Sequence, residues 1–240
     1  MPRHLLILVM ALSVGTATAQ PAPSEKGKKW EFSVFYGVSS RGDHLFATPF
    51  VVATGGNTST IELRNVGLNF APGYMVGARI TENLGDHFGA ELEYNLANQP
   101  MQFTNLTPTT ARVDLQQRVH SVNYAILLYG LDRKHKLRPY GVLGPSLSYF
   151  ETYGDSVARA VAAGVPVKDR WQVGGVVGGG VKYHATKEIG FRFDVRDNFT
   201  GVPSYGLPDT GAAQKAALLP DGMLHNWQFS VGFFYTFKGR

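Results

Sequence analysis

Apolar and polar residues alternate with a period of two along most of this chain. That period is typical of β-strands whose two faces meet different environments. Several of the alternating segments exceed the roughly 9–11 residues that a tilted strand needs to cross a membrane. Pro145, inside the fifth segment, predicts a local bulge. The eight segments that alternate are Trp30–Val38, Tyr74–Ile80, Phe88–Leu96, Leu115–Tyr129, Arg138–Phe150, Trp171–Tyr183, Ile189–Arg196 and Trp227–Phe237.

The connections between these segments alternate strictly between long and short. The short ones are Thr81–His87, Leu131–Leu137 and His184–Glu188, and the long ones are Arg41–Asn69, Ala97–Asp114, Thr152–Arg170 and Thr200–His225. Barrels of the bacterial outer membrane have short periplasmic turns and long external loops. The pattern predicts an all-β fold, an eight-stranded antiparallel up-and-down transmembrane barrel with four long external loops and both termini in the periplasm.

Alternation alone leaves open which face of the barrel points outward. A soluble, lipocalin-like barrel would turn its apolar face inward, whereas a membrane barrel turns it toward lipid. The polar face is rich in glycine and other small residues, which suits a crowded lumen. Tryptophans lie near strand ends on the apolar face, at Trp30, Trp171 and Trp227, as expected of aromatic residues at a membrane interface. We therefore expect the apolar face to contact lipid.

The first 29 residues differ from the rest of the chain. Arg3 and His4 precede the short apolar run Leu5–Val14, and small residues at 17–19 provide a cleavage site for a signal peptidase. We expect residues 1–19 to be a signal peptide, 20–29 a polar leader and 30–240 the barrel domain. No later stretch reaches the ~18 consecutive apolar residues of a membrane-spanning helix.

Composition removes several classes of function. With 12% aromatic and only 17% charged residues, the chain does not have the composition of a disordered protein. It has no cysteine, so thiol catalysis and thiolate metal sites are excluded. The net charge of +5 is spread along the chain, which does not indicate binding to nucleic acid. No motif for a cofactor or a metal is present.

Four stretches of sequence resemble a known family. They are WEFSVFYGVSS from Trp30, RPYGVLGPS from Arg138, GFRFDVRD from Gly190 and the aromatic-alternating last segment. Together they resemble the small eight-stranded outer-membrane β-barrel proteins, which include the OmpA transmembrane domain and the OmpX-like and opacity-type proteins. The resemblance implies contact with outer-membrane lipid and lipopolysaccharide. It also implies that the barrel-assembly machinery reads Phe233, Tyr235 and Phe237, although Lys238-Gly239-Arg240 follow here, which departs from the family pattern.

Charged residues lie at inward positions of the expected barrel, four of each sign. Charges in a narrow lumen are tolerated when they are paired, so we expect an ion-pair network that plugs the barrel. Folding about the short turns places Arg79 beside Gly89 and Glu91, and lets Glu93 meet Arg192 through the lumen. The eight residues of this expected network are Glu31, Glu91, Glu93, Asp194, Arg79, Lys182, Arg192 and Arg196.

Three classes of function remain open. An eight-stranded barrel is just wide enough for its own side chains, which favours a structural or surface-interaction protein, adhesin-like in character, that meets an unidentified external ligand through its loops. A narrow passive channel is the alternative. A lipid-modifying hydrolase is the third class. Its only candidate base and nucleophile, His120 and Ser121, are adjacent in sequence, so their side chains point to opposite faces of a strand.

Overall fold

The computed structural model describes residues 29–41, 44–46, 50–51, 62–63, 66–104, 112–155, 157–158, 169–201 and 223–238. The expected signal peptide and nearly all of the expected leader lie outside these residues. The described strands are β1 Lys29–Arg41, β2 His44–Phe46, β3 Phe50–Val51, β4 Glu62–Leu63, β5 Val66–Phe70, β6 Gly73–Asn83, β7 Phe88–Asn98, β8 Met101–Thr104, β9 Arg112–Tyr129, β10 Leu137–Tyr153, β11 Arg170–His184, β12 Ile189–Gly201 and β13 Met223–Lys238.

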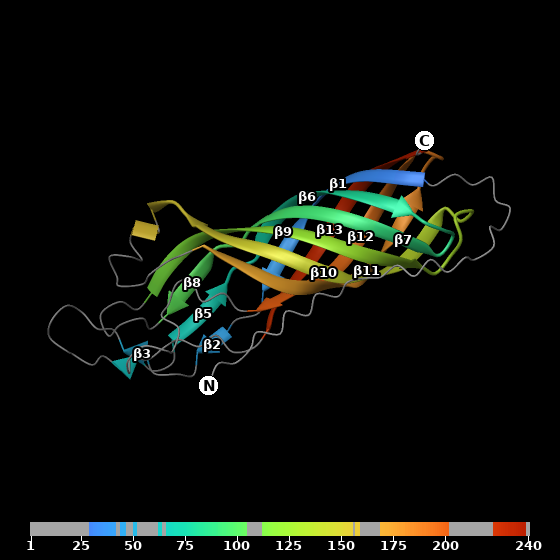
Figure 1. Ribbon diagram of the computed structural model, residues 1–240. Coiled ribbons are helices and arrows are strands. Elements are labelled where there is room, and N and C mark those ends of the chain that lie inside the picture. Colours follow the sequence, from blue (N-terminus) through green and yellow to red (C-terminus); the bar gives the residue numbers. More distant parts are fainter. Residues whose placement is uncertain are drawn as a thin grey trace, which may run out of the picture.

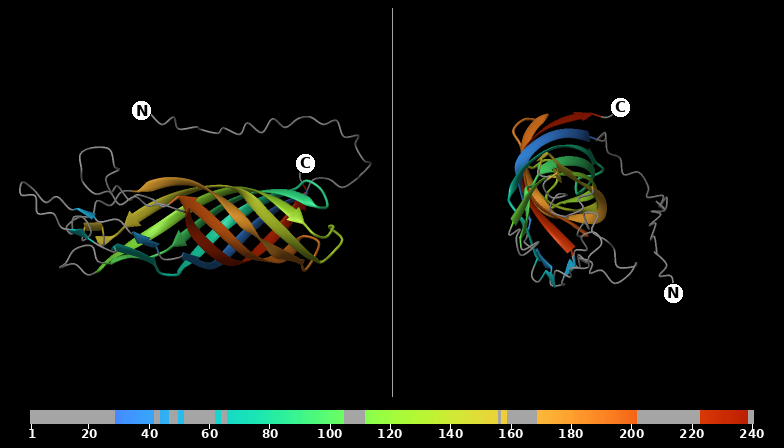
Figure 2. Two further views of the ribbon diagram at one scale, coloured as in Figure 1. Left: turned by 90° about the horizontal axis from the view of Figure 1, so that it is seen from below. Right: turned by 90° about the vertical axis from the view of Figure 1, so that its left-hand side faces the viewer.

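Eight of these strands form a closed antiparallel barrel, which confirms the expected fold class (Figures 1 and 2). Its order is β1, β6, β7, β9, β10, β11, β12 and β13, and all of β1 pairs with β13 to close the cylinder. The strands tilt strongly around the barrel axis (Figure 2). Because closure leaves no free edge, every strand of the wall has a partner on both sides.

One end of the barrel carries the three short turns, and we call it the turn end; the opposite end is the loop end. At the loop end the sheet continues beyond the closed barrel, because β8 pairs with β9 and β5 pairs with both β8 and β2. A separate two-stranded sheet joins β3 to β4. Two segments that were expected to be long loops, 41–69 and 97–114, therefore contain strands. The expectation that they have no regular structure was incomplete.

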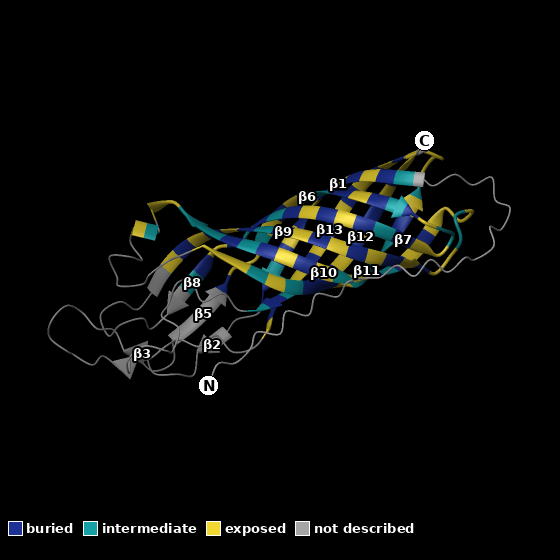
Figure 3. Cartoon of the chain, in the orientation of Figure 1, coloured by how far each residue is buried: buried dark blue, intermediate teal, exposed yellow. Residues whose placement is uncertain are grey.

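The two faces of the wall are buried to very different degrees, as the checkerboard of Figure 3 shows. Phe193 and Val231 on the outer face are 54% and 53% exposed, whereas the inward Ser230 beside them is 5% exposed. The apolar face therefore points outward, which is the arrangement of a membrane barrel. Among the described residues, no helix is long and apolar enough to span a membrane.

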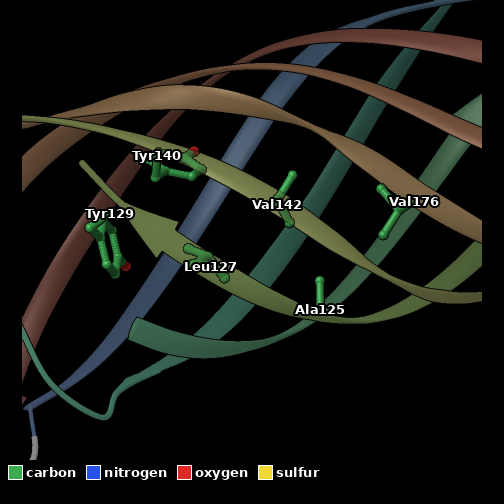
Figure 4. Packing of buried hydrophobic residues seen from close by; sticks show 6 residues of the cluster. All are labelled: Ala125, Leu127, Tyr129, Tyr140, Val142 and Val176. Carbon is green, nitrogen blue, oxygen red and sulfur yellow. The ribbon is translucent and has the colours of Figure 1, made fainter. Parts of the chain in front are cut away.

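The lumen is filled by side chains, some of them apolar. Inward residues of β9, β10 and β11 pack together near the barrel wall (Figure 4). This cluster consists of Ala125, Leu127, Tyr129, Tyr140, Val142 and Val176. Inward glycines make room for large rings: a Cβ on Gly77 would lie 2.3 Å from the Phe35 ring, and one on Gly190 would lie 2.2 Å from the Phe234 ring.

The expected bulge at Pro145 is wrong. β10 keeps a single register against β9 on both sides of this residue, with Leu143 opposite Ile126 and Ser146 opposite Asn123. Within the stretch Tyr140–Tyr153 that pairs with β9, only Gly144 and Pro145 lack a partner there, while both remain paired with β11. Proline has no N–H to donate to a ladder, so here it interrupts the hydrogen bonding without inserting an extra residue.

Candidate functional site

Charged side chains cross the lumen. They come from β6, β7 and β12 and occupy inward positions on these strands. All of them are at most 3% exposed, and positive and negative residues are equal in number. We call this set the lumen charge cluster; it consists of Arg79, Glu91, Glu93, Arg192, Asp194 and Arg196.

Arg79 joins two walls of the barrel. It is the direct cross-strand neighbour of Glu93 and forms an ion pair with it. Its Nη1 also lies 2.9 Å from the Asp194 carboxylate on β12. Since β1 and β13 separate β6 from β12 in the wall, the second contact reaches through the lumen. The Arg79 guanidinium also lies 3.8 Å from the centre of the Phe35 ring, within cation–π distance.

Two further arginines connect β12 to β7 on the opposite side of the barrel. Arg192 Nη1 lies 2.7 Å from Glu91, and Arg196 lies 2.7 Å from Glu91 and 2.8 Å from Glu93. Asp194 accepts from both arginines, at 3.1 Å and 3.0 Å. Each carboxylate of the cluster is thus shared by at least two guanidinium groups, which is the pairing that buried charges require.

Neutral groups complete the cluster, and the sequence analysis did not assign them this role. The Tyr140 hydroxyl donates to Asp194 and accepts from Arg192 Nη2 at 2.7 Å. Thr81 donates to Glu91 at 2.8 Å, and the Asn95 and Asn123 amides donate to Glu93 at 2.9 Å and 2.8 Å. The inward parity of Asn95 and Asn123 was visible in the sequence, whereas Thr81 was expected in a turn. Which carboxylate each of these groups contacts depends on the register between strands.

A second buried ion pair joins β11 to β1. Lys182 pairs with Glu31, and its Nζ also donates to the Tyr129 hydroxyl at 2.8 Å. Asn83 donates to the other Glu31 oxygen at 2.8 Å. All eight residues of the expected network therefore lie inside the barrel, divided between the lumen charge cluster and this pair.

Two expected neighbours within the network are wrong. Arg79 lies directly opposite Glu93, and the expected neighbour Gly89 lies opposite Asn83 instead. The other expected neighbour, Glu91, is diagonal to Arg79 and forms an ion pair with it at 3.7 Å. The expected pairing of Glu93 with Arg192 is replaced by pairs of Arg192 with Glu91 and of Glu93 with Arg196. The pairing of Glu93 with Arg192 was expected for upright strands, whereas closing a barrel tilts and staggers them.

The three tryptophans point outward at both ends of the barrel. Trp171 and Trp227 are 62% and 48% exposed and lie toward the loop end. The centres of the Trp171 and Tyr149 rings lie 4.8 Å apart. Trp30 is half-buried and lies at the turn end beside Phe237. Phe233, Tyr235 and Phe237 form an outward aromatic row on β13, the strand that closes the barrel.

The structure brings no nucleophile and base together at His120 and Ser121. His120 lies on the outer side, where Nδ1 is 2.8 Å from the Tyr94 hydroxyl and Nε2 is 3.3 Å from Glu151. Ser121 points into the lumen and shares a 2.9 Å hydrogen bond with Ser148. Within the described ranges, no group of three or more histidine and carboxylate side chains is placed to hold a metal ion.

Comparisons with known proteins agree with this architecture. The solved structure of the outer membrane protein OprG from Pseudomonas aeruginosa shares 14% identity and a TM-score of 0.57, covering 89% of this chain and 98% of OprG. Escherichia coli outer membrane protein W shares 22% identity over 90% of this chain and all of that protein, with a TM-score of 0.35. A search of curated proteins finds no match. Residues 6–237 match the family described as the outer membrane protein beta-barrel domain, and the chain therefore belongs to that family of bacterial outer-membrane proteins.

Proposed function

We propose that this protein is a closed outer-membrane barrel with a structural or surface-interaction role, adhesin-like in character, and that it does not transport solutes through its lumen. The observation that supports this is the lumen charge cluster. Its side chains reach across the barrel from β6 and β7 to β12, and none is more than 3% exposed. A solute that followed the axis would have to separate several buried ion pairs.

The loop end supports a contact role. There the wall is prolonged by β8, which pairs with β9, and by β5, which pairs with β8. This prolongation extends the hydrogen-bonded sheet beyond the closed barrel at this end. Binding residues are often carried on loops that a rigid scaffold positions, and we infer that an external ligand is met at this end.

The proposed orientation places the loop end outside the cell and both termini in the periplasm. β1 begins and β13 ends at the turn end, and short turns face the periplasm in bacterial barrels. The outward row of Phe233, Tyr235 and Phe237 is proposed as the signal read by the barrel-assembly machinery. The tryptophans Trp30, Trp171 and Trp227 are proposed to lie at the two membrane interfaces, in contact with lipid and lipopolysaccharide headgroups.

Planar-bilayer recording tests the closed lumen. Purified protein, with folding verified by heat-modifiable gel migration, is expected to give no steady conductance. A large, stable and ion-selective conductance in the unmodified protein would contradict the proposal and make a narrow passive channel the better description.

The surface role is tested separately on cells. Bacteria that express the protein are expected to adhere to host-cell monolayers more strongly than cells without it. Replacing residues 202–222 with a short Gly-Ser linker should reduce adhesion while leaving the amount of heat-modifiable barrel unchanged. Equal adhesion by all three strains would contradict an adhesin-like role and leave a structural one.

A further inference from the structure

A cavity of about 310 Å³ lies in the mouth of the barrel at the turn end. This volume is at the lower end of the roughly 300–1,000 Å³ of small-molecule pockets. Its walls come from inward residues at the turn end of several strands, and from the two short turns that follow β9 and β11. The cavity is separate from the lumen charge cluster, none of whose residues lines it.

The lining of this cavity is strongly cationic. Its positively charged residues are Arg133, Lys134, Lys136, Arg138 and Lys187. The one carboxylate in the lining belongs to Glu31, which already pairs with Lys182. In the described part of the chain, no carboxylate lies within 4 Å of the ammonium groups of Lys134, Lys136 or Lys187. Arg133 lies 3.9 Å from the Asp86 carboxylate, so the protein neutralises the positive charge of the cavity only in part.

Arg138 and Thr236 show that the site is partly built into the fold. The Arg138 side chain is buried, stacks 3.8 Å from the centre of the Tyr129 ring, and donates to the backbone carbonyls of Leu131 and Asp86 at 3.3 Å and 2.8 Å. No described carboxylate forms an ion pair with it. Thr236 is 7% exposed, and its hydroxyl oxygen has no hydrogen-bond partner in the described structure. A buried polar group without a partner is costly, and a ligand in the cavity would supply one.

We infer that this cavity binds a small, water-soluble phosphate ester. A phosphate group carries close to two negative charges at neutral pH and several acceptor oxygens. These match the planar guanidinium groups of Arg133 and Arg138 and the point charges of the lysines. The volume leaves room for a small polar group on the ester. Because the cavity lies inside the ring of strands and is lined by turns, its ligand enters from water at the turn end and not sideways from the lipid.

Calorimetric titration of the folded barrel with glycerol 3-phosphate tests the inference. In phosphatidylcholine nanodiscs at low salt, we expect saturable binding. Lys187→Gln is expected to weaken it about tenfold, the effect of losing one charge-assisted hydrogen bond. Lys187 is exposed in a turn, so this change leaves the wall intact. Arg170→Gln, an exposed residue of the loop end, removes the same charge away from the cavity and should leave the affinity unchanged.

A second variant and a second lipid make the test specific. Thr236→Val keeps the shape of the side chain and removes only the hydroxyl, and should weaken binding several-fold. Phosphatidylglycerol in the nanodisc should not compete; competition would assign the site to a lipid headgroup and overturn the assignment to a soluble ester. Absence of saturable binding, or equal losses in Lys187→Gln and Arg170→Gln, would also overturn it. Because no residue of the lumen charge cluster lines the cavity, bilayer conductance does not bear on this result.

Discussion

Glu93 is the residue whose replacement tests the lumen charge cluster most directly. Its carboxylate pairs with Arg79, lies 2.8 Å from Arg196 Nη1, and accepts from the Asn95 and Asn123 amides. Glu93→Gln keeps the size of the side chain and removes the negative charge. The cluster then holds three cations and two anions, all of them at most 3% exposed.

The expected loss follows from the partners that remain. Breaking a buried ion pair by removing one member costs about 3–5 kcal/mol. Here both arginines keep another carboxylate, since Arg79 still has Asp194 at 2.9 Å and Arg196 still has Glu91 at 2.7 Å. We therefore expect a loss of about 3 kcal/mol in the free energy of unfolding, at the lower end of that range.

Guanidinium unfolding of the lipid-inserted barrel measures this loss through the fluorescence of the three tryptophans. Glu188→Gln is the matched control, because Glu188 is exposed in a turn and should change stability by less than about 0.5 kcal/mol. The double variant Glu93→Gln, Arg196→Gln should lose less than the sum of its two single variants. A loss below about 1 kcal/mol in Glu93→Gln, or strict additivity in the double variant, would refute the argument that paired charges stabilise the lumen.

Three further outcomes are expected. Val231→Arg places a charge on the lipid-facing wall and should lower the free energy of unfolding by roughly 2–4 kcal/mol if it lies near the membrane centre. Ser230→Arg points into the lumen and acts mainly through crowding. Equal losses for the two variants in unfolding assays would show that the faces are misassigned. Gly77→Ala should cost about 1–3 kcal/mol by overpacking, because the new methyl would overlap the ring already there; an unchanged unfolding midpoint would contradict this. The pKa of Asp132 is lowered, and the largest cause is a hydrogen bond from the Lys134 backbone amide. The ionised carboxylate therefore stabilises the fold above the ordinary pKa of aspartate, and this contribution disappears as the pH falls through the lowered pKa. An NMR titration midpoint at or above the ordinary value would contradict this.

The sequence predicted the barrel well because both of its faces follow one simple rule. Alternation along Trp227–Phe237 assigns every second residue to lipid, and the structure places those residues outward. The lengths of the connections separated the two ends. The strands at the loop end were not expected, because β2 to β5 are short and have no clear alternation of their own. β2 pairs with β5 and β3 with β4, and β5 also pairs with β8, which in turn pairs with the end of the longer β9.

The members of the lumen network could be predicted, whereas their partners could not. Parity alone puts Arg79, Glu93 and Arg192 inside the barrel. Which pairs touch depends on how far each strand is displaced against the next, and that displacement accumulates around the cylinder. The same reasoning explains why Tyr140 and Asn123 were not recognised as part of the site. The cavity at the turn end was equally hidden, because its lining comes from turns and strand ends far apart in the sequence.

The charged lumen also helps to fix how the strands pair. A slip of one residue would move every side chain of a strand to the other face. For β12, such a slip would put Arg192, Asp194 and Arg196 into lipid and Phe191 and Phe193 into the polar lumen. An arginine that faces lipid near the membrane centre lowers stability by roughly 2–4 kcal/mol. The carboxylates of Glu91 and Glu93 on β7 would also lose their arginine partners and stay buried. Lipid on one side and ion pairs on the other therefore penalise the same error independently. The inside of this barrel thus does for register what an apolar core does in a soluble protein, with charge complementarity selecting the one alignment that satisfies both faces.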